Sequence, residues 1–429
     1  MRRRILLSAL VSGALALAAV LTWSQHRAST RDAHLDAARA ALGAPFREAP
    51  ELHDLEAGDA LAHLEAAREL GAEVDQEVAE AESVAFLVAG DLVSAAGALR
   101  EAKRPGWTAR TRLVAAAIAV GRGHLDEADE HVREATILGA DLGDTDHRRA
   151  LLFAGDLALD REEARAARDA FAELARLEPD VAAVHNRHGL ALEALGDLAA
   201  ARAEVARALE LDPELVDAWV NHGRQERAAG ETEASAAAFR RATELAAGRG
   251  DAWLGRGLAA LDAGDLDRAR PAIERARELS PESLDAALAE GDLLRAEGRL
   301  EEAANAYRLV MRDNLHHAGG WVKLGNVLFA TGERADAAFA YRQALERDPS
   351  LAAAHNGLGA ALMGRDDGAA RVALERAAEL DGADPHPLMN LALLAERSGD
   401  RAGARDAWSR ALERAPGSPV AEAHLEALR

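Results

Sequence analysis

Side chains that could hold a peptide recur along this chain at a fixed spacing. An asparagine offers hydrogen-bond donors and acceptors together, so spaced asparagines can hold an extended peptide by its backbone without reading its side chains. The candidates fall in three rows with steps of 34 residues, and one step of 33: Asn221, Lys323 and Asn390; Asn186 and Asn356; Arg224 and Asn326. The rows predict a peptide-binding surface. The alternative is that these polar residues only solvate an exposed helix face.

Motifs for catalysis are absent from the sequence. It contains no H-E-x-x-H or G-x-S-x-G, and its only lysines, Lys103 and Lys323, follow no phosphate-binding glycine loop. The chain has no cysteine, which removes thiolate nucleophiles, cysteine zinc sites and a lipid-modified cysteine. We therefore expect no enzymatic activity, no cofactor and no small-molecule substrate.

One pair of histidines has the spacing of metal ligands. His185 and His188 are one helical turn apart, which is compatible with a shared metal ion. They also fall where neighbouring repeats place the tryptophan and leucine of a packing stripe. We favour packing over metal binding and expect no metal site.

The rows follow a repeat that is clearest in the glycines. Glycine recurs every 34 residues, at Gly155, Gly189, Gly223, Gly257, Gly291, Gly325 and Gly359. A second glycine series follows seven residues behind the first, and it loses one residue in the turn near Asp366 to Gly368. A fixed period of this length indicates a repeat protein.

Each repeat has the pattern of two short helices. In residues 216–249, Trp219 and Gly223 lie on one helical stripe, Gly230 marks a turn, and Ala238, Phe239 and Ala242 follow at helical spacing. A glycine inside a helix costs about 1 kcal/mol relative to alanine. Its regular use predicts that a partner helix approaches closely at that position.

The repeat signature resembles that of the tetratricopeptide repeat (TPR) family, a 34-residue helix-turn-helix. Two segments carry it best: Val216-Asp-Ala-Trp219-Val-Asn-His-Gly223 and Gly320-Trp321-Val-Lys-Leu324-Gly325. The resemblance implies an all-α, right-handed solenoid of antiparallel helix pairs. It also implies that the first helices line a concave groove that binds peptides or partner helices. The lysine and asparagine set that clamps a C-terminal carboxylate in chaperone-binding members is not reproduced; Lys323 and Asn326 are its nearest pieces.

The repeats and their flanks account for the whole chain. We expect a signal anchor or transmembrane segment at 1–27, a helical lead-in at 28–75, and two degenerate TPR-like units at 76–147. Eight regular units follow at 148–418, and a capping helix at 419–429 ends the chain. An acidic connector, Asp141 to Asp146, is expected to lead into the regular units.

The N-terminus predicts membrane insertion. Ile5 to Trp23 is an uncharged run that would be roughly 28 Å long as a helix, close to the bilayer core of about 30 Å. Arg2, Arg3 and Arg4 favour a cytoplasmic amino end, which places the repeats outside. The run is either a retained anchor or a signal peptide cleaved after Ala18; its length favours retention. We expect a single-pass bacterial inner-membrane protein with periplasmic repeats, or an exported protein if cleavage occurs.

The charge narrows the class of partner. The net charge is −22, and residues 1–30 carry four arginines and no acid, which leaves −26 on the remainder. An acidic body argues against nucleic acid and anionic lipid surfaces, which require a basic face. The sequence therefore predicts a membrane-tethered, non-enzymatic scaffold that binds a protein or peptide partner, in envelope complex assembly. The alternative is a cytoplasm-facing co-chaperone or regulatory subunit.

Overall fold

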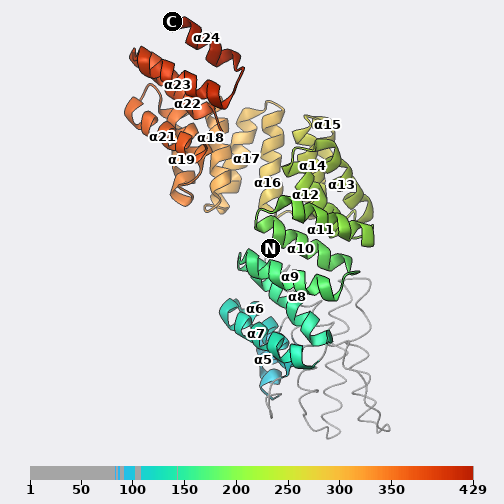
Figure 1. Ribbon diagram of the computed structural model, residues 1–429. Coiled ribbons are helices and arrows are strands. Elements are labelled where there is room, and N and C mark those ends of the chain that lie inside the picture. Colours follow the sequence, from blue (N-terminus) through green and yellow to red (C-terminus); the bar gives the residue numbers. More distant parts are fainter. Residues whose placement is uncertain (1–82, 84–85, 87–90, 102–107, 143, 429) are drawn as a thin grey trace, which may run out of the picture. The chain divides into compact units, whose positions relative to one another are not determined.

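The described part of the chain is entirely helical. The computed structural model describes residues 83, 86, 91–101, 108–142 and 144–428, which form 20 helices and no strand (Figure 1). The expected anchor at 1–27 and lead-in at 28–75 lie outside these residues. None of the helices in the described ranges combines the length and apolar character needed to cross a bilayer. The all-helical prediction is confirmed for this part of the chain.

The chain divides into two compact halves, Met1–Gln225 and Glu226–Arg429. The helices of the amino-terminal half are α5 (Leu92–Glu101), α6 (Ala109–Arg122), α7 (Leu125–Leu142), α8 (Asp144–Asp160), α9 (Ala164–Leu177), α10 (Ala182–Ala194), α11 (Leu198–Leu211) and most of α12 (Val216–Ala228).

The carboxyl-terminal half continues the series. Its helices are α13 (Thr232–Leu245), α14 (Gly250–Asp262), α15 (Leu266–Leu279), α16 (Leu284–Ala296), α17 (Leu300–Asp313), α18 (Ala318–Ala330), α19 (Arg334–Arg347), α20 (Ala352–Leu362), α21 (Asp367–Leu380), α22 (His386–Ser398), α23 (Arg401–Arg414) and α24 (Pro419–Ala427).

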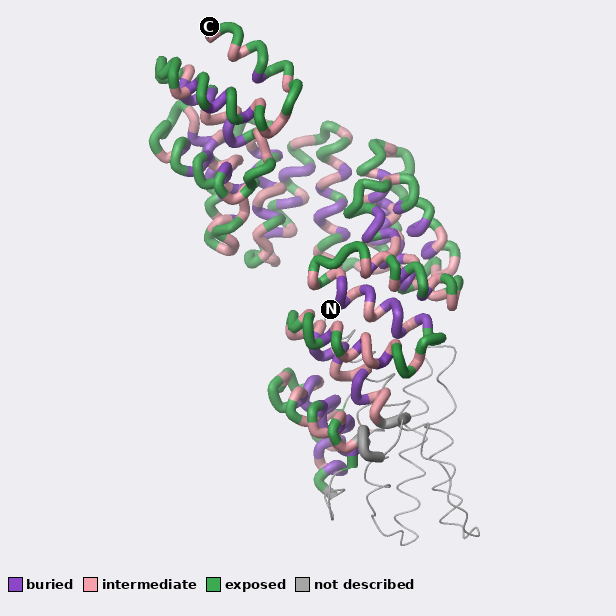
Figure 2. Tube along the Cα trace, viewed as in Figure 1, coloured by how far each residue is buried: buried purple, intermediate pink, exposed green. Residues whose placement is uncertain are grey.

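Even-numbered helices from α6 to α22 are the first helices of the repeats, and odd-numbered helices from α7 to α23 are the second helices. Within each half, a first helix packs against the second helix that follows it and against the second helix that precedes it. Buried residues gather along these contacts, while the turns are exposed (Figure 2). This chain of helix pairs is a TPR-type solenoid arrangement in each half.

The expected connector before α8 is not a loop. The second helix α7 extends to Leu142 and the first helix α8 begins at Asp144. The first helix of the regular units therefore begins four residues before the unit start expected at residue 148.

The mid-helix glycines permit close helix packing, as their spacing predicts. A Cβ atom added to Gly325 of α18 would lie 2.7 Å from a ring carbon of Tyr341 in α19. Gly255 of α14 meets Phe239 of the preceding second helix, α13, even more closely. In these pairs the ring on the second helix thus occupies the space that a first-helix side chain would otherwise need.

The glycines of the second series end the first helices. Gly196, for example, has φ +80°, a left-handed conformation that suits glycine because it has no Cβ. The α8–α9 turn places Glu162 at the equivalent position, with φ 61°. At the α20–α21 turn, where the repeat is one residue shorter, Gly364 has φ +83° and Asp366 caps α21 by accepting a hydrogen bond from the Ala369 amide.

An aromatic ring at the fourth residue of the repeat fixes the start of five first helices, α10, α12, α14, α18 and α20. The indole nitrogens of Trp219, Trp253 and Trp321 each donate a hydrogen bond to the carbonyl oxygen six residues earlier, at 2.8 to 3.0 Å. His185 and His355 make the same contact through Nε2, at 2.9 and 3.0 Å. The recurrence of tryptophan therefore has a polar cause as well as a packing one.

The last helix covers the end of the array. Trp408 of α23 is fully buried, and the ring of His424 in α24 stacks on it at 4.4 Å between centroids. The Glu396 carboxylate of α22 accepts a hydrogen bond from the Trp408 indole at 2.7 Å and lies 2.9 Å from His424 Nδ1. These contacts attach α24 to both helices of the final repeat.

Candidate peptide-binding surface

All seven candidate residues lie on first helices, but in two separate sets. Asn186 of α10 with Asn221 and Arg224 of α12 belong to the amino-terminal half. Lys323 and Asn326 of α18, Asn356 of α20 and Asn390 of α22 belong to the carboxyl-terminal half. Each set is therefore a separate candidate surface.

The side chains of the amino-terminal set form contacts between neighbouring first helices. Asn221 Nδ2 donates to Asn186 Oδ1 at 2.9 Å, and both residues are only 6% exposed. Arg224 pairs with the Glu193 carboxylate of α10 at 3.2 Å. Because the asparagine pair is buried, this set links α10 to α12 and leaves little polar surface for a peptide.

Lys323 is also engaged within the protein. Its ammonium group contacts both carboxylate oxygens of Asp292 in α16, at 2.9 and 2.7 Å. The Tyr307 hydroxyl donates to the same carboxylate at 2.7 Å. Burial, together with the Asp292 charge, raises the pKa of Tyr307 well above its ordinary value. The positive charge of Lys323 is therefore paired and is not free to hold a carboxylate of a partner.

A second asparagine pair remains accessible. Asn390 Nδ2 donates to Asn356 Oδ1 at 2.8 Å, and both residues are only partly buried. No other hydrogen bond within the described part of the chain uses the Asn356 amide hydrogens or the Asn390 side-chain oxygen. The pair therefore presents a donor and an acceptor next to each other.

Asn326 adds a third amide on the adjacent first helix. Its Oδ1 accepts a hydrogen bond from the Tyr341 hydroxyl at 2.8 Å, while the residue itself is exposed. Burial raises the pKa of Tyr341 to about 12, so this hydroxyl stays protonated and keeps the asparagine oriented. Because α18 packs against α20, Asn326 lies on the helix next to that of Asn356.

Apolar residues on the same helices were missed by the sequence reasoning. Phe329 at the end of α18 and Met363 after α20 are partly buried neighbours of the core, and Leu393 of α22 is 38% exposed. Phe329 and Met363 are 34 residues apart, and Leu393 stands in the row of Asn326. The sequence signal for these apolar residues is their spacing along the repeat.

The two histidines His185 and His188 contact one carboxylate, that of Glu204. His185 Nδ1 lies 2.6 Å from one oxygen of Glu204 in α11, and His188 Nδ1 lies 3.2 Å from the other oxygen. His185 Nε2 is held by the Pro179 carbonyl oxygen. The Glu204 carboxylate thus bridges the Nδ1 atoms of both histidines and connects α10 to α11.

The protein is an α-helical repeat protein in which pairs of polar side chains link neighbouring first helices. Comparison with known families identifies the repeat. A tetratricopeptide repeat model matches residues 152–215, 220–276 and 256–313, and a TPR repeat model matches residues 325–365. These matched segments therefore have the sequence pattern of tetratricopeptide repeats.

Solved structures agree on the fold. The Cut9–Hcn1 hetero-tetramer of the APC/C matches with a TM-score of 0.55 and 16% identity over 91% of this chain and 89% of that one. A monomeric mutant of IFIT1 with Gppp-AAAA matches with a TM-score of 0.55 and 13% identity, over 75% and 81% of the two chains. Yeast Tom70 matches at 0.46 and 16% identity, over 93% and 95%. No curated protein matches the chain in sequence.

Together these findings support a TPR-type helical repeat fold. At such low identities the solved structures support the fold alone. TPR proteins are in general non-enzymatic scaffolds that bind protein or peptide partners, which agrees with the class expected from the sequence.

Proposed function

We propose that this protein is a membrane-tethered scaffold that captures an extended segment of a partner protein on the first helices of its carboxyl-terminal half, in the assembly of an envelope complex. The observation that carries the proposal is the accessible Asn356–Asn390 pair, which offers one donor and one acceptor. An extended peptide offers one carbonyl and one amide per residue, so the pair matches its backbone.

The surroundings of this pair suit a peptide. Asn326 supplies a further amide on the adjacent helix α18, oriented by Tyr341. Phe329 and Leu393 stand at apolar positions beside these amides and would accept side chains of the bound segment. Capture would then combine backbone hydrogen bonds with shallow apolar contacts.

The membrane tether rests on the N-terminal sequence. The uncharged run from Ile5 to Trp23 follows three arginines, a pattern typical of an anchor whose amino end stays in the cytoplasm. The acidic body is repelled by anionic lipid, so the repeats would extend away from the membrane surface. In this topology the partner is an envelope protein.

Crosslinking in intact cells, followed by purification and mass spectrometry, tests the capture surface. Asn356→Asp keeps the oxygen that accepts from Asn390 but removes the amide donor. We expect it to reduce recovery of crosslinked partners at least about fivefold, as expected for the loss of a buried hydrogen bond. Asn305→Asp is the matched control, because exposed Asn305 of α17 also accepts through Oδ1, from Arg308. Equal recovery from both variants would exclude Asn356 from the binding surface.

Protease treatment of intact spheroplasts tests the topology separately. A periplasmic array is degraded from outside, whereas a cytoplasmic array is protected until the membrane is broken. Protection would reject the proposed topology and support the cytoplasm-facing alternative, without affecting the capture surface itself.

A further inference from the structure

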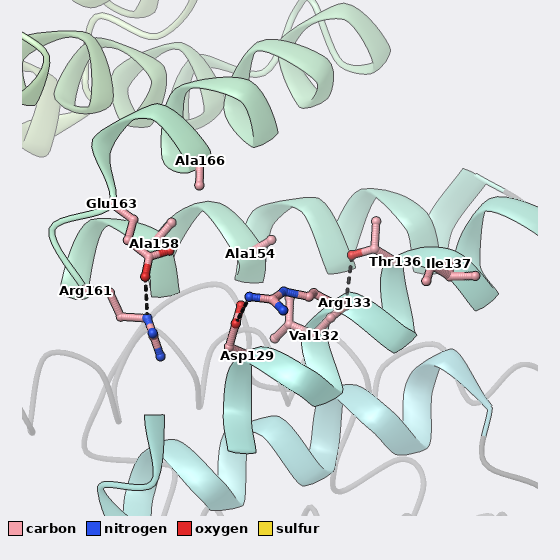
Figure 3. A pocket seen from close by; sticks show the side chains of 10 residues that line it. All are labelled: Asp129, Val132, Arg133, Thr136, Ile137, Ala154, Ala158, Arg161, Glu163 and Ala166. Carbon is pink, nitrogen blue, oxygen red and sulfur yellow. Dashed lines mark hydrogen bonds and ion pairs between the residues drawn. The ribbon is translucent and has the colours of Figure 1, made fainter. Parts of the chain in front are cut away.

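A groove of about 400 Å³ lies between α7, α8 and α9, in the amino-terminal half (Figure 3). Two second helices form its walls and the intervening first helix α8 forms its floor, through Ala154 and Ala158. Figure 3 shows Arg161 and Glu163 at one end of the groove and Ile137 at the other. The groove belongs to no surface described so far.

The groove exists because α8 carries two small residues on its floor. At 34-residue steps from Ala154, the later first helices carry His188, His222, Arg256, Glu290, Leu324 and Leu358. Each of these side chains is larger than alanine. One of them, Arg256 of α14, donates a hydrogen bond at 3.2 Å to Thr243 of the preceding second helix, α13, so the position does face the gap between second helices. Those repeats place a larger side chain at this position, whereas α8 has an alanine there and the groove is open.

The two ends of the groove differ in chemistry. Val132 and Ile137 lie toward one end. Val132 is buried, whereas Ile137 is 68% exposed. At the other end the Arg161 guanidinium is shared between Asp126 and Glu163, at 2.8 Å each, which leaves one net negative charge. Exposed Glu162 in the same turn adds a second.

The remaining charges on the wall cancel. Asp129 and Arg133 of α7 pair with each other along the groove. The groove therefore combines an apolar floor and end with a turn that carries an excess of two negative charges. Its volume exceeds that of a single large side chain, and its charge favours a cation.

We propose that this groove is a second docking site, for a partner segment in which a bulky aliphatic or aromatic residue adjoins an arginine or lysine. The bulky side chain occupies the space above Ala154 and Ala158 that other repeats fill themselves. The adjoining cation lies against Glu162 and Glu163. The site is on different helices from the Asn356–Asn390 pair. The proposal therefore does not depend on whether that pair binds a peptide.

Fluorescence anisotropy with labelled peptides and the full-length protein tests the site, at about 0.15 M salt so that long-range attraction is screened. The probes are a peptide of three Leu-Arg repeats, one of three Ala-Arg repeats and one of three Leu-Glu repeats. We expect the Leu-Arg peptide to bind at least about tenfold more tightly than either of the others, because only it supplies both the apolar side chain and the charge.

Two variants assign that binding to the groove. Ala154→Leu fills the floor, and Ile137→Ser removes the exposed apolar end without touching the core. We expect each to weaken binding of the Leu-Arg peptide about tenfold. Ala194→Leu, which adds the same side chain at an exposed position of α10, is the control and should leave binding unchanged. Should Ala154→Leu fail to fold, Ile137→Ser alone decides. Unchanged affinity in the folded variants, or equal binding of the Leu-Glu peptide, would overturn the proposal.

Discussion

Glu162 carries a backbone conformation that its side chain disfavours. It is the one residue other than glycine with positive φ in the described part of the chain, and the residue one repeat later is Gly196. A left-handed conformation costs a residue with a Cβ about 1 to 2 kcal/mol, and glycine escapes that cost but loses more entropy on folding.

We therefore expect Glu162→Gly to raise the free energy of unfolding by about 1 kcal/mol, as measured by urea denaturation. Gly196→Ala is the reverse test. A Cβ at Gly196 would meet nothing within 4 Å, so its effect isolates the backbone. We expect that variant to lose about 1 kcal/mol. A gain in stability from Gly196→Ala would show that the turn relaxes to another conformation.

The buried hydroxyl of Tyr341 makes stability depend on pH in the alkaline range. Burial raises its pKa to about 12 from an ordinary value near 10. A group with a raised folded-state pKa stabilises the fold fully below its unfolded pKa, and the effect is lost as the pH rises through the folded value. We expect about 2 to 3 kcal/mol to be lost between about pH 10 and about pH 12.

Tyr341→Phe should make that decline shallower, since it removes the titrating group. The chain contains two tyrosines, so tyrosinate absorbance reports on Tyr307 and Tyr341 alone. Ionisation of either residue at pH 10 in the folded protein would contradict their raised pKa values.

The sequence located candidate residues on first helices but did not find their partners. By the 34-residue period, Asn186 and Asn221 occupy different positions of their repeats. In the structure their side chains form a hydrogen bond between α10 and α12. Such a pair joins residues 35 apart, and its formation depends on the offset between successive repeats. A period gives the position of a residue within its own repeat but not that offset.

At the scale of helices, the glycine spacing was the most informative signal. The first helices α10, α12, α14, α16, α18 and α20 begin at Ala182, Val216, Gly250, Leu284, Ala318 and Ala352, at steps of 34 residues that equal the glycine spacing. The start of α8 differs: this helix begins at Asp144, four residues before the unit start expected at residue 148. Turn glycines and packing glycines mark helix ends far more sharply than acidic composition does.

Close packing between repeats predicts a steric effect at Gly255. A methyl group there would collide with the Phe239 ring of the preceding second helix. We expect Gly255→Ala to lower the free energy of unfolding by about 1 to 3 kcal/mol, the usual cost of overpacking, despite the better helix propensity of alanine.

The matched control for this steric effect is Gly248→Ala, at a turn glycine whose added Cβ would meet nothing within 4 Å. We expect little change from it by denaturant titration. Equal stability of Gly255→Ala and the native protein would mean that the α13 ring moves aside without cost.

At the scale of the whole molecule, net charge should dominate the response to salt. The chain carries a net charge of −22, whereas most of its ion pairs are exposed. Exposed pairs contribute only about 0 to 1 kcal/mol each, and salt weakens them together with the general repulsion. We expect Tm to rise by a few degrees between about 0.02 and about 0.3 M sodium chloride, because relief of repulsion outweighs the loss of pairs.

Calorimetric scans at several salt concentrations check this response. A falling Tm would show that the ion-pair network matters more than net repulsion. The same scans with potassium sulfate distinguish screening from anion binding, since screening depends on ionic strength alone.

The fold class followed from the sequence because repetition multiplies a weak local signal. One glycine at one position is uninformative, but the same glycine in seven consecutive repeats is not. The groove above Ala154 could not be foreseen in the same way. It arises where the repeat departs from its own pattern, and a departure becomes visible only when the neighbouring helices show which space has been left open.

The repeat that lacks one residue shows where the chain tolerates a change in length. Its first helix α20 has 11 residues, whereas α10, α12, α14, α16 and α18 have 13, and the turn that follows α20 is one residue longer than theirs. A residue lost inside a helix would rotate every later side chain by about 100° and bring the wrong residues to the neighbouring helix. Between Leu362 and Asp367 the loss is absorbed by Gly364 and the Asp366 cap, and α21 and α22 pack as their predecessors do. Insertions and deletions that persist through evolution of this array should therefore accumulate in its turns and in the helix ends beside them, while the interiors of the helices stay unchanged.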